Sequence, residues 1–255
     1  MIRRVSAVLV WTGEVAVFAL RVFREAFRAP REGAEIARQV LEVGWRSLPL
    51  IAAAGFAVGA VMSMHTRSSL ERFGAEALIP AGLALALFKE TGPLVTGLLF
   101  AGRVGAGIGA ELGAMRVTEQ IDALETLAVD SFKFLVVTRV AACVLVLPLL
   151  TTIMNFAGII GGFVAETAIS GMSFSLYWER AWSLVNFTDY VPATLKTCVF
   201  GFIIGSVSSY LGYNATGGTA GVGQASTRSV VVTSILLIVC NVVLVKAIFF
   251  LFPAA

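Results

Sequence analysis

The stretch that decides the fold is FLVVTRVAACVLVLPLLTTIMNFAGIIGGFV, residues 134–164, in which Arg139 is the only charged residue. A membrane-spanning helix needs about 20 mostly apolar residues, because the hydrocarbon core is about 30 Å thick and a helix rises about 1.5 Å per residue. This run is longer than one crossing requires, so we expect it to tilt or to project beyond the bilayer. The chain therefore crosses a membrane.

The composition supports the same conclusion. Of 255 residues, 58% are hydrophobic and 14% are charged, whereas a soluble domain carries about 45–50% apolar and about 25% charged residues. Too little charge is present to cover a water-facing surface of this size. These values exclude a disordered chain, a nucleic-acid-binding protein and an ordinary cytosolic enzyme, and they predict an all-α integral membrane protein.

Outward from residues 134–164, four further apolar runs are long enough to cross a bilayer, which predicts five spans in all. We expect residues 43–255 to form the five-span domain and residues 1–42 to form an N-terminal amphipathic helix with its connector. The predicted spans are residues 43–64, 77–108, 134–164, 191–213 and 230–252.

The N-terminal segment has an amphipathic pattern. Val8, Trp11, Val15, Phe18 and Val22 fall on one face of a helix, and arginines lie around them. The apolar core is short for a span, which favours a helix lying in the headgroup plane. A sixth span and a cleaved signal peptide stay open as alternatives, although no small-residue cleavage site follows the apolar core.

Orientation follows from lysines and arginines near the span ends, which are enriched on the cytoplasmic side. Eight arginines lie before the first span or in its first turn, and four basic residues lie between the second and third spans or in the adjoining ends of those spans. The first and third loops carry only three basic residues together. We therefore expect a cytoplasmic N-terminus and, after five spans, a periplasmic C-terminus.

Residues 109–128, GAELGAMRVTEQIDALETLA, are the least membrane-like long stretch after the N-terminus. As one helix, they would place Val117, Ile121 and Leu124 on an apolar stripe opposite Glu119 and Asp122. Two interpretations stay open from periodicity alone. The helix is either a solvated cytoplasmic loop helix or a surface helix whose acidic face receives a partner.

Lys89 and Glu90 lie inside the second apolar run and are followed by Gly92 and Pro93. Ionisable residues at membrane depth are costly and usually face a cavity or each other. Neighbours on a helix point in different directions, so each of the two needs its own partner or water. The segment is either a charged, hydrated point in a substrate cavity or two shorter helices joined by a water-exposed turn.

Other chemistry finds little support. His65 is the only histidine, and the three cysteines lie in apolar runs without metal-ligand or disulfide-framework spacing. The glycine-rich stretches lack both the dinucleotide fingerprint and the Lys-Ser/Thr of a phosphate-binding loop. Lys196 and Lys246 fit snorkelling lysines. We expect no catalytic residue, no metal site and no cofactor in this chain; any ATPase is a separate chain.

Two blocks resemble the signature of the MlaE (YrbE/TGD-type) permease family, the membrane subunit of MCE-linked ABC lipid transporters. The first is FGAE at 73–76 with FKETGPLVTGLLFAGRVGAGIGAELGAMRVTEQIDALETLAVD at 88–130. The second is LKTCVFG at 195–201 with GGTAGVGQASTRSVVVTSI at 217–235. The resemblance covers roughly residues 40–252.

The resemblance implies a homodimer in the inner membrane that moves phospholipid between that membrane and the outer envelope. A cytoplasmic ABC ATPase would bind ATP and Mg²⁺, an MCE-domain ring would sit on the periplasmic side, and a small accessory subunit is possible on the ATPase. It also implies that Lys89 and Glu90 line the lipid cavity, with Met62, Leu70 and Phe73 as weaker candidates. The expected coupling residues are Glu111, Met115, Glu119, Asp122 and Glu125.

Three positions depart from the family pattern. Lys89 replaces a more usual arginine and loses the bidentate fork for phosphate. Gln224 stands where a basic residue is common, and Asn241 where aspartate is common. Transport of another lipid class, such as sterols, stays an alternative. So do an intramembrane lipid-modifying enzyme using Lys89 and Glu90 as acid and base, and a purely structural scaffold.

Overall fold

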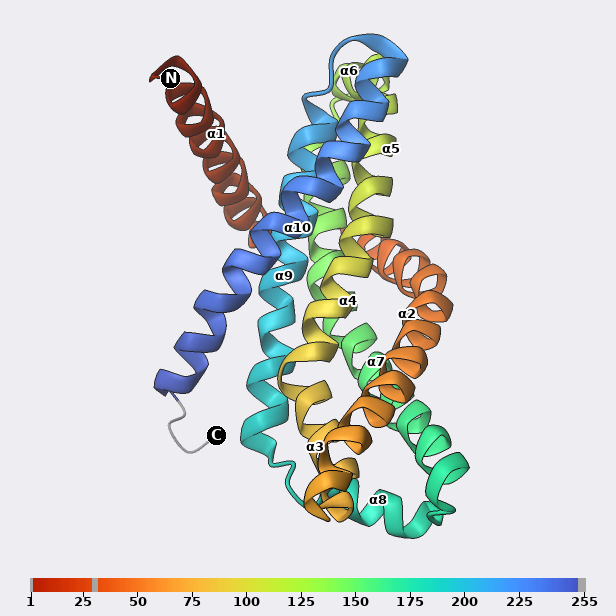
Figure 1. Ribbon diagram of the computed structural model, residues 1–255. Helices are drawn as coiled ribbons and strands as arrows, with labels where there is room; N and C mark the ends of the chain where they lie inside the picture. The colour runs from red at the N-terminus through yellow and green to blue at the C-terminus, as the bar shows by residue number, and fades with distance from the viewer. Residues whose placement is uncertain (1, 29–31, 252–255) are drawn as a thin grey trace. The chain divides into compact units, whose positions relative to one another are not determined.

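The computed structural model describes residues 2–28 and 32–251 (Figure 1). Within them the chain is helical apart from short connections and contains no strand. Five helical runs in this part are long and apolar enough to cross a membrane, as the sequence predicts. The chain is therefore an all-α, multi-pass membrane protein. The ends of the two predicted domains, residues 1 and 252–255, and residues 29–31 of the predicted connector lie outside the described residues.

The structure contains five spanning runs, which are built from α-helices, π-helical turns and short 3₁₀ turns. The five spanning runs are Gly33–Phe73, Glu76–Val117, Phe132–Ser170, Phe187–Tyr213 and Gly218–Phe250. The α-helices are α1 Ile2–Ala26, α2 Gly33–Leu70, α3 Ile79–Ala86, α4 Gly92–Phe100, α5 Ala106–Val117, α6 Gln120–Thr126, α7 Thr138–Ser170, α8 Phe174–Trp182, α9 Phe187–Tyr213 and α10 Gly218–Leu251. Two short 3₁₀ turns are η1 Glu71–Phe73 and η2 Glu76–Leu78, and three π-helical turns are η3 Leu87–Thr91, η4 Ala101–Gly105 and η5 Phe132–Val137.

Helix α2 begins ten residues before the predicted start of the first span at Val43. Its first turns contain charged residues, and low hydropathy there is the reason the sequence predicts a connector at these positions. There Arg38 donates to both carboxylate oxygens of Glu35, at 2.7 and 2.9 Å. Pairs three residues apart stabilise an exposed helix, so the helix extends beyond its apolar part.

The contacts divide the chain into two units, and the long helices contribute residues to both. The first unit comprises residues 1–43, 100–146 and 199–237. The second comprises residues 44–99, 147–198 and 238–255.

In the first unit, α1 packs against the start of the third spanning run. Val22 is buried beside Phe132, Phe18 contacts the Phe132 ring edge-on at 5.1 Å, and the guanidinium of Arg21 lies 4.0 Å from the same ring. The amphipathic face therefore packs on protein, while Leu9, Val17, Leu20, Phe23 and other apolar side chains of α1 stay exposed. Helix α1 is not among the five spanning runs. The side chain of Val8 lies outside the described residues.

In the second unit, small residues let α2 and α7 approach closely. A Cβ atom on Gly55 would lie 2.5 Å from the carbonyl oxygen of Met154, and one on Gly59 would collide with the main chain of Gly158. Glycines at this four-residue spacing allow backbones to meet in a membrane, where hydrophobicity does not drive helices together.

A buried ion pair joins the same two helices. Arg67 of α2 pairs with Glu166 of α7 through two guanidinium nitrogens, and the Glu166 side chain is fully buried. Nearby, the phenol of Tyr177 on α8 is buried, and desolvation together with the Glu166 carboxylate raises its pKa above the ordinary range.

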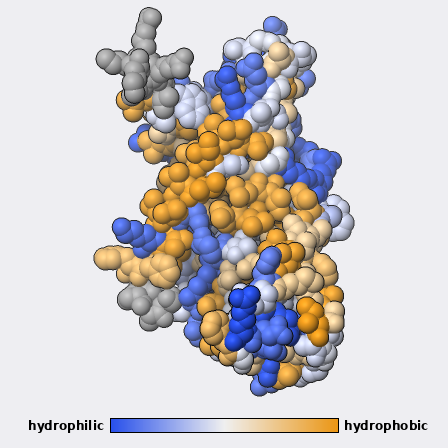
Figure 2. Space-filling model, viewed as in Figure 1, coloured by the Kyte–Doolittle hydropathy of each residue, from blue (hydrophilic) through white to orange (hydrophobic). Residues whose placement is uncertain are grey.

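Helix α10 is the least enclosed of the five. Hydrophobic side chains follow it on the face shown in Figure 2, and the exposed ones are Val231, Ile235, Leu236, Ile238, Val239, Val242, Val243, Phe249 and Phe250. A face of this kind meets either lipid or another protein.

Candidate functional site: a charged cavity and a two-part surface segment

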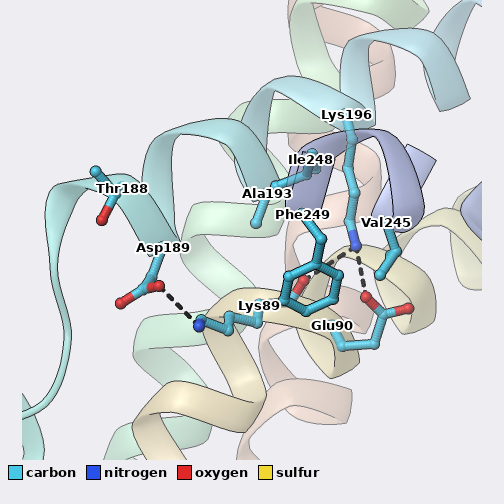
Figure 3. Close-up of a pocket in the computed structure, with 9 residues that line it drawn as sticks. All are labelled: Lys89, Glu90, Thr188, Asp189, Ala193, Lys196, Val245, Ile248 and Phe249. Carbon is cyan, nitrogen blue, oxygen red and sulfur yellow. Dashed lines mark hydrogen bonds and ion pairs between the residues drawn. The ribbon is translucent and has the colours of Figure 1, made fainter. Parts of the chain in front are cut away.

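A cavity of about 240 Å³ in the second unit gathers charged side chains among apolar ones (Figure 3). We call it the charged cavity. Its lining residues are Lys89, Glu90, Thr188, Asp189, Ala193, Lys196, Val245, Ile248 and Phe249. They come from η3, from α9 and from α10, so three segments distant in sequence contribute to it.

A π-helical turn presents Lys89 and Glu90. The run from Ile79 continues through η3 into α4 without a break, so the water-exposed turn that the sequence left open is absent here. Gly92 follows directly, and a Cβ atom there would collide with the Asn155 side chain. Pro93 cannot donate a main-chain hydrogen bond. A π-helical turn accommodates the missing main-chain hydrogen bond at Pro93. Such π-bulges frequently occur at functional sites.

Lys89 pairs with Asp189. Its ammonium nitrogen lies 2.8 Å from Asp189 Oδ1, and the aspartate side chain is almost completely buried. The other oxygen of Asp189 accepts a 3.1 Å hydrogen bond from the main-chain nitrogen of Asn186. Asp189 is thus the third residue of α9 and closes back on the residue before the helix, as in a capping box. The cap fixes the carboxylate that faces Lys89.

Glu90 has different partners. Lys196 donates to Glu90 Oε2 at 2.7 Å and to the Lys89 carbonyl oxygen at 3.0 Å. The amide nitrogen of Asn241 donates to Glu90 Oε1. As expected for neighbours on a helix, Lys89 and Glu90 point to separate partners (Figure 3). The charged cavity therefore holds two ion pairs, Lys89–Asp189 and Glu90–Lys196. One member of each pair comes from adjacent residues of η3, and apolar side chains complete the lining.

The sequence interpretation missed two of these four charges. The sequence pattern does not single out Asp189, and the interpretation of Lys196 as a snorkelling lysine is wrong because only 2% of its side chain is exposed and it pairs with Glu90. A signal was present. Asp189, Ala193 and Lys196 are spaced four and three residues apart, which places them on one face of a helix. An acidic and a basic residue on one face of an apolar run indicate a site.

The remaining predicted cavity residues lie elsewhere. Met62 packs against the core cluster around Leu83 and Phe88. Leu70 ends α2, and Phe73 follows in η1 with 83% of its surface exposed. None of the three lines the charged cavity. Of the departures from the family pattern, Asn241 contacts Glu90, whereas Gln224 is exposed on α10 and is not a lining residue of the charged cavity.

The predicted coupling helix is not one helix. Helix α5 ends at Val117 and α6 begins at Gln120, because Glu119 adopts the left-handed conformation with φ of 59°. Arg116 bridges the break by pairing with Asp122 at 2.6 Å. The continuous apolar stripe is therefore wrong, and Ile121 is the one member of it that is fully buried.

The five predicted coupling residues divide into two groups in the first unit. Glu111 pairs with buried Arg139 at 2.6 Å, and Glu125 accepts a hydrogen bond from Ser131 at 2.7 Å. These two glutamates hold the segment in place. Glu119 and Asp122 are exposed, and Met115 is half-buried. Leu127 after them is exposed as well.

The sequence matches a family of known proteins over most of its length. The family model described as Permease MlaE matches residues 36–247. The chain belongs to the MlaE permease family. It is 38% identical over 237 residues to a probable ABC transporter permease protein of Rickettsia bellii, covering 93% of this chain and 92% of that protein.

Two further relatives of this MlaE-family permease carry more specific names. The intermembrane phospholipid transport system permease protein MlaE of Haemophilus influenzae is 31% identical over 215 residues, 84% of this chain and 82% of that protein. The chloroplastic protein TRIGALACTOSYLDIACYLGLYCEROL 1 of Arabidopsis thaliana is 31% identical over 236 residues, 92% of this chain and 67% of that protein.

Among the described residues, no cluster of three or more His, Cys, Asp or Glu side chains could hold a metal ion.

Proposed function

We propose that this chain is the membrane subunit of an ABC transporter that moves phospholipid between the inner membrane and the outer envelope. A separate partner ATPase would bind ATP and Mg²⁺ and supply the energy. The observation that carries the proposal is the charged cavity, in which two ammonium groups and two carboxylates meet an apolar wall. The family membership and the name of the Haemophilus relative support a phospholipid as the substrate.

The chemistry of the cavity suits a phospholipid headgroup. Lys89 and Lys196 can bind phosphate oxygens as point charges, without the bidentate geometry of arginine. Asp189 and Glu90 can bind a headgroup amine, and Val245, Ile248 and Phe249 can pack against the start of the acyl chains. With no lipid bound, the four charges neutralise one another, which lowers the cost of holding them at membrane depth.

An enzyme is a poorer explanation of the same residues. General acid–base catalysis on one substrate atom needs both groups within hydrogen-bond reach of it. Lys89 and Glu90 instead turn to Asp189 and Lys196 respectively. The relatives are named as permease proteins, which also favours transport over catalysis by this chain.

A second copy of the chain would complete the transporter. The exposed apolar face of α10 supports a homodimer, in which a lipid cavity is shared between the subunits. The experiment is disulfide cross-linking of Val243→Cys in native membranes, with the three natural cysteines replaced by alanine. We expect a covalent dimer from Val243→Cys and none from Leu149→Cys, an equally lipid-accessible position on α7. Equal cross-linking of both would contradict this interface.

The surface segment around Glu119 and Asp122 would receive the ATPase. The N-terminus would be cytoplasmic and the C-terminus periplasmic, with an MCE-domain ring on the periplasmic side and a possible small accessory subunit on the ATPase. Closure of the ATPase would push the two α5–α6 segments of the dimer together. The single helical run Glu76–Val117 contains both α5 and η3, so one continuous element can carry that motion to Lys89 and Glu90.

Affinity purification from native membranes, with mass spectrometry of bound lipid and protein, tests the proposal. We expect phospholipid and an ABC ATPase with the wild-type chain. Lys89→Ala with Glu90→Ala should lose the lipid and keep the ATPase, whereas Lys246→Ala, which alters an exposed lysine of α10, should keep both. A sterol as the bound lipid, or phospholipid retained in the double variant, would contradict it.

A further inference from the structure

Each ion pair of the charged cavity has one accessible member and one buried member. In the first pair, 31% of the Lys89 side chain is exposed but only 4% of the Asp189 side chain. In the second pair, 42% of the Glu90 side chain is exposed but only 2% of the Lys196 side chain. The first charges that a ligand meets are therefore the cation of one pair and the anion of the other.

The buried members hold the two accessible charges in place. The Asp189 carboxylate accepts from the main-chain nitrogen of Asn186, and the Lys196 ammonium group donates to the Lys89 carbonyl oxygen. Asn241 donates to Glu90 from its amide nitrogen. A buried charge is costly without a partner, so Asp189 and Lys196 keep opposite charges close to them. The accessible pattern of one positive and one negative group is thus built into the cavity.

The charge balance of the cavity limits the net charge of a ligand. Among the described lining residues, two cations face two anions, and Lys89 and Glu90 lie inside a spanning run. A ligand with one net negative charge would leave that charge uncompensated at membrane depth, which is costly. A ligand with one negative and one positive group leaves the balance unchanged. The cavity therefore favours a zwitterion over an anion.

The accessible charges also lie at separate points. Lys89 and Glu90 extend in opposite directions from η3 (Figure 3). Phosphate oxygens can bind the ammonium group of Lys89, and the Glu90 carboxylate can accept charge-assisted hydrogen bonds from a second ammonium group. A phosphoethanolamine headgroup carries both functions, joined by a short carbon link. A phosphoglycerol headgroup carries the phosphate but offers Glu90 only neutral hydroxyl groups.

We propose that Glu90 determines headgroup specificity by binding the ammonium group of a zwitterionic phospholipid, while Lys89 binds the phosphate. This rests on the proposed phospholipid function and deepens it by naming the headgroup class. Asp189 and Lys196 are positioning residues, which hold the two accessible charges apart and keep the empty cavity neutral. An anionic phospholipid would engage Lys89 and leave Glu90 facing it without a cation.

The test compares two phospholipids with the same acyl chains. The permease, purified in complex with its ATPase, is loaded with a fluorescent phosphatidylethanolamine, which unlabelled phosphatidylethanolamine or phosphatidylglycerol then displaces at one ionic strength. A hydrogen bond to a charged group corresponds to about a ten- to hundredfold change in affinity. Because Glu90 is partly exposed, water screens the interaction. We therefore expect a preference of about tenfold for phosphatidylethanolamine.

Three variants make the result specific to the charge of Glu90. Glu90→Gln keeps the shape of the side chain but leaves Lys196 without its anion, so the preference should disappear or reverse in favour of phosphatidylglycerol. Glu90→Asp keeps the charge and should keep the preference. Glu179→Gln removes an exposed carboxylate of α8 outside the cavity lining and should bind both lipids as the wild type does. A structural role alone would lower binding of both lipids without changing their ratio.

The outcomes separate this proposal from the function on which it rests. Equal affinity of the wild-type complex for the two lipids would overturn the proposal and leave phospholipid transport standing, and this comparison needs no variant. An unchanged preference in a folded Glu90→Gln complex would also overturn it. Binding of neither phospholipid by the wild-type complex would contradict the proposed function as well.

Discussion

Replacing Arg67 by methionine is the change with the most predictable energetic consequence. Glu166 has a fully buried side chain, and its other hydrogen bond comes from the Ser170 hydroxyl at 3.2 Å. Arg67→Met would leave this carboxylate without a cation. Removing one partner of a buried ion pair costs about 3–5 kcal/mol, because the remaining charge stays desolvated. Arg67→Met should therefore be strongly destabilising.

Removing the carboxylate should cost less, for a reason visible in the structure. Arg67 has a second acidic neighbour, Glu76, at 3.5 Å, whereas among the described residues Glu166 forms an ion pair with Arg67 alone. In Glu166→Gln the amide oxygen still accepts from Arg67, and Glu76 compensates part of the charge, so we expect about 1–3 kcal/mol. Replacing both residues, Arg67→Met with Glu166→Met, should return to within about 1 kcal/mol of wild type.

Thermal unfolding of the purified chain in one detergent measures this series. For a chain of this size, 1 kcal/mol corresponds to about 2–4 °C in Tm. Arg67→Met should lower Tm by about 6–20 °C, Glu166→Gln by less, and the double variant should recover most of the loss. A double variant less stable than Arg67→Met, or an Arg67→Met variant as stable as wild type, would refute the reasoning.

Two further predictions follow from the surface segment and from helix packing. Charge reversal of Glu119 and Asp122 to lysine should abolish co-purification with the ATPase because both are exposed on the segment, whereas Glu179→Lys on α8 should not; undiminished ATPase in the double variant would remove the docking assignment. Gly59→Ala should lower Tm, because the added methyl group collides with the main chain of α7 at a cost of about 1–3 kcal/mol. The matched change Gly82→Ala meets open space and should raise Tm slightly, so equal effects at both glycines would contradict the packing argument.

The five spans were predictable from sequence because apolar length is all that a span requires. Where the helices begin and end was not. Hydropathy marks Val43, but α2 starts at Gly33, since charged residues such as Glu35 and Arg38 continue a helix beyond its apolar part. Likewise the break at Glu119 depends on a single left-handed residue, which periodicity over residues 109–128 does not register.

Sequence reasoning singles out cavity residues where a charge is conspicuous and overlooks them where an ordinary explanation is sufficient. Lys89 and Glu90 stood out in an apolar run and line the charged cavity. Lys196 had an acceptable explanation as a snorkelling lysine, and Arg67 counted only as a loop charge, yet both are buried and paired. Their partners, Glu90 and Glu166, lie about a hundred residues away in the chain. Pairing over that distance is set by tertiary packing and has no local signature.

The central claim is that the charged cavity binds the phospholipid that the transporter moves. Lipid transfer by the reconstituted complex, driven by ATP and measured with a fluorescent phospholipid, tests it most directly. Lys89→Ala with Lys196→Ala removes both ammonium groups that would bind phosphate, and each charge-assisted hydrogen bond is worth about tenfold or more. The account predicts that transfer falls by at least about tenfold while Lys246→Ala transfers at the wild-type rate. Wild-type transfer by the double variant, with the complex intact, would contradict it.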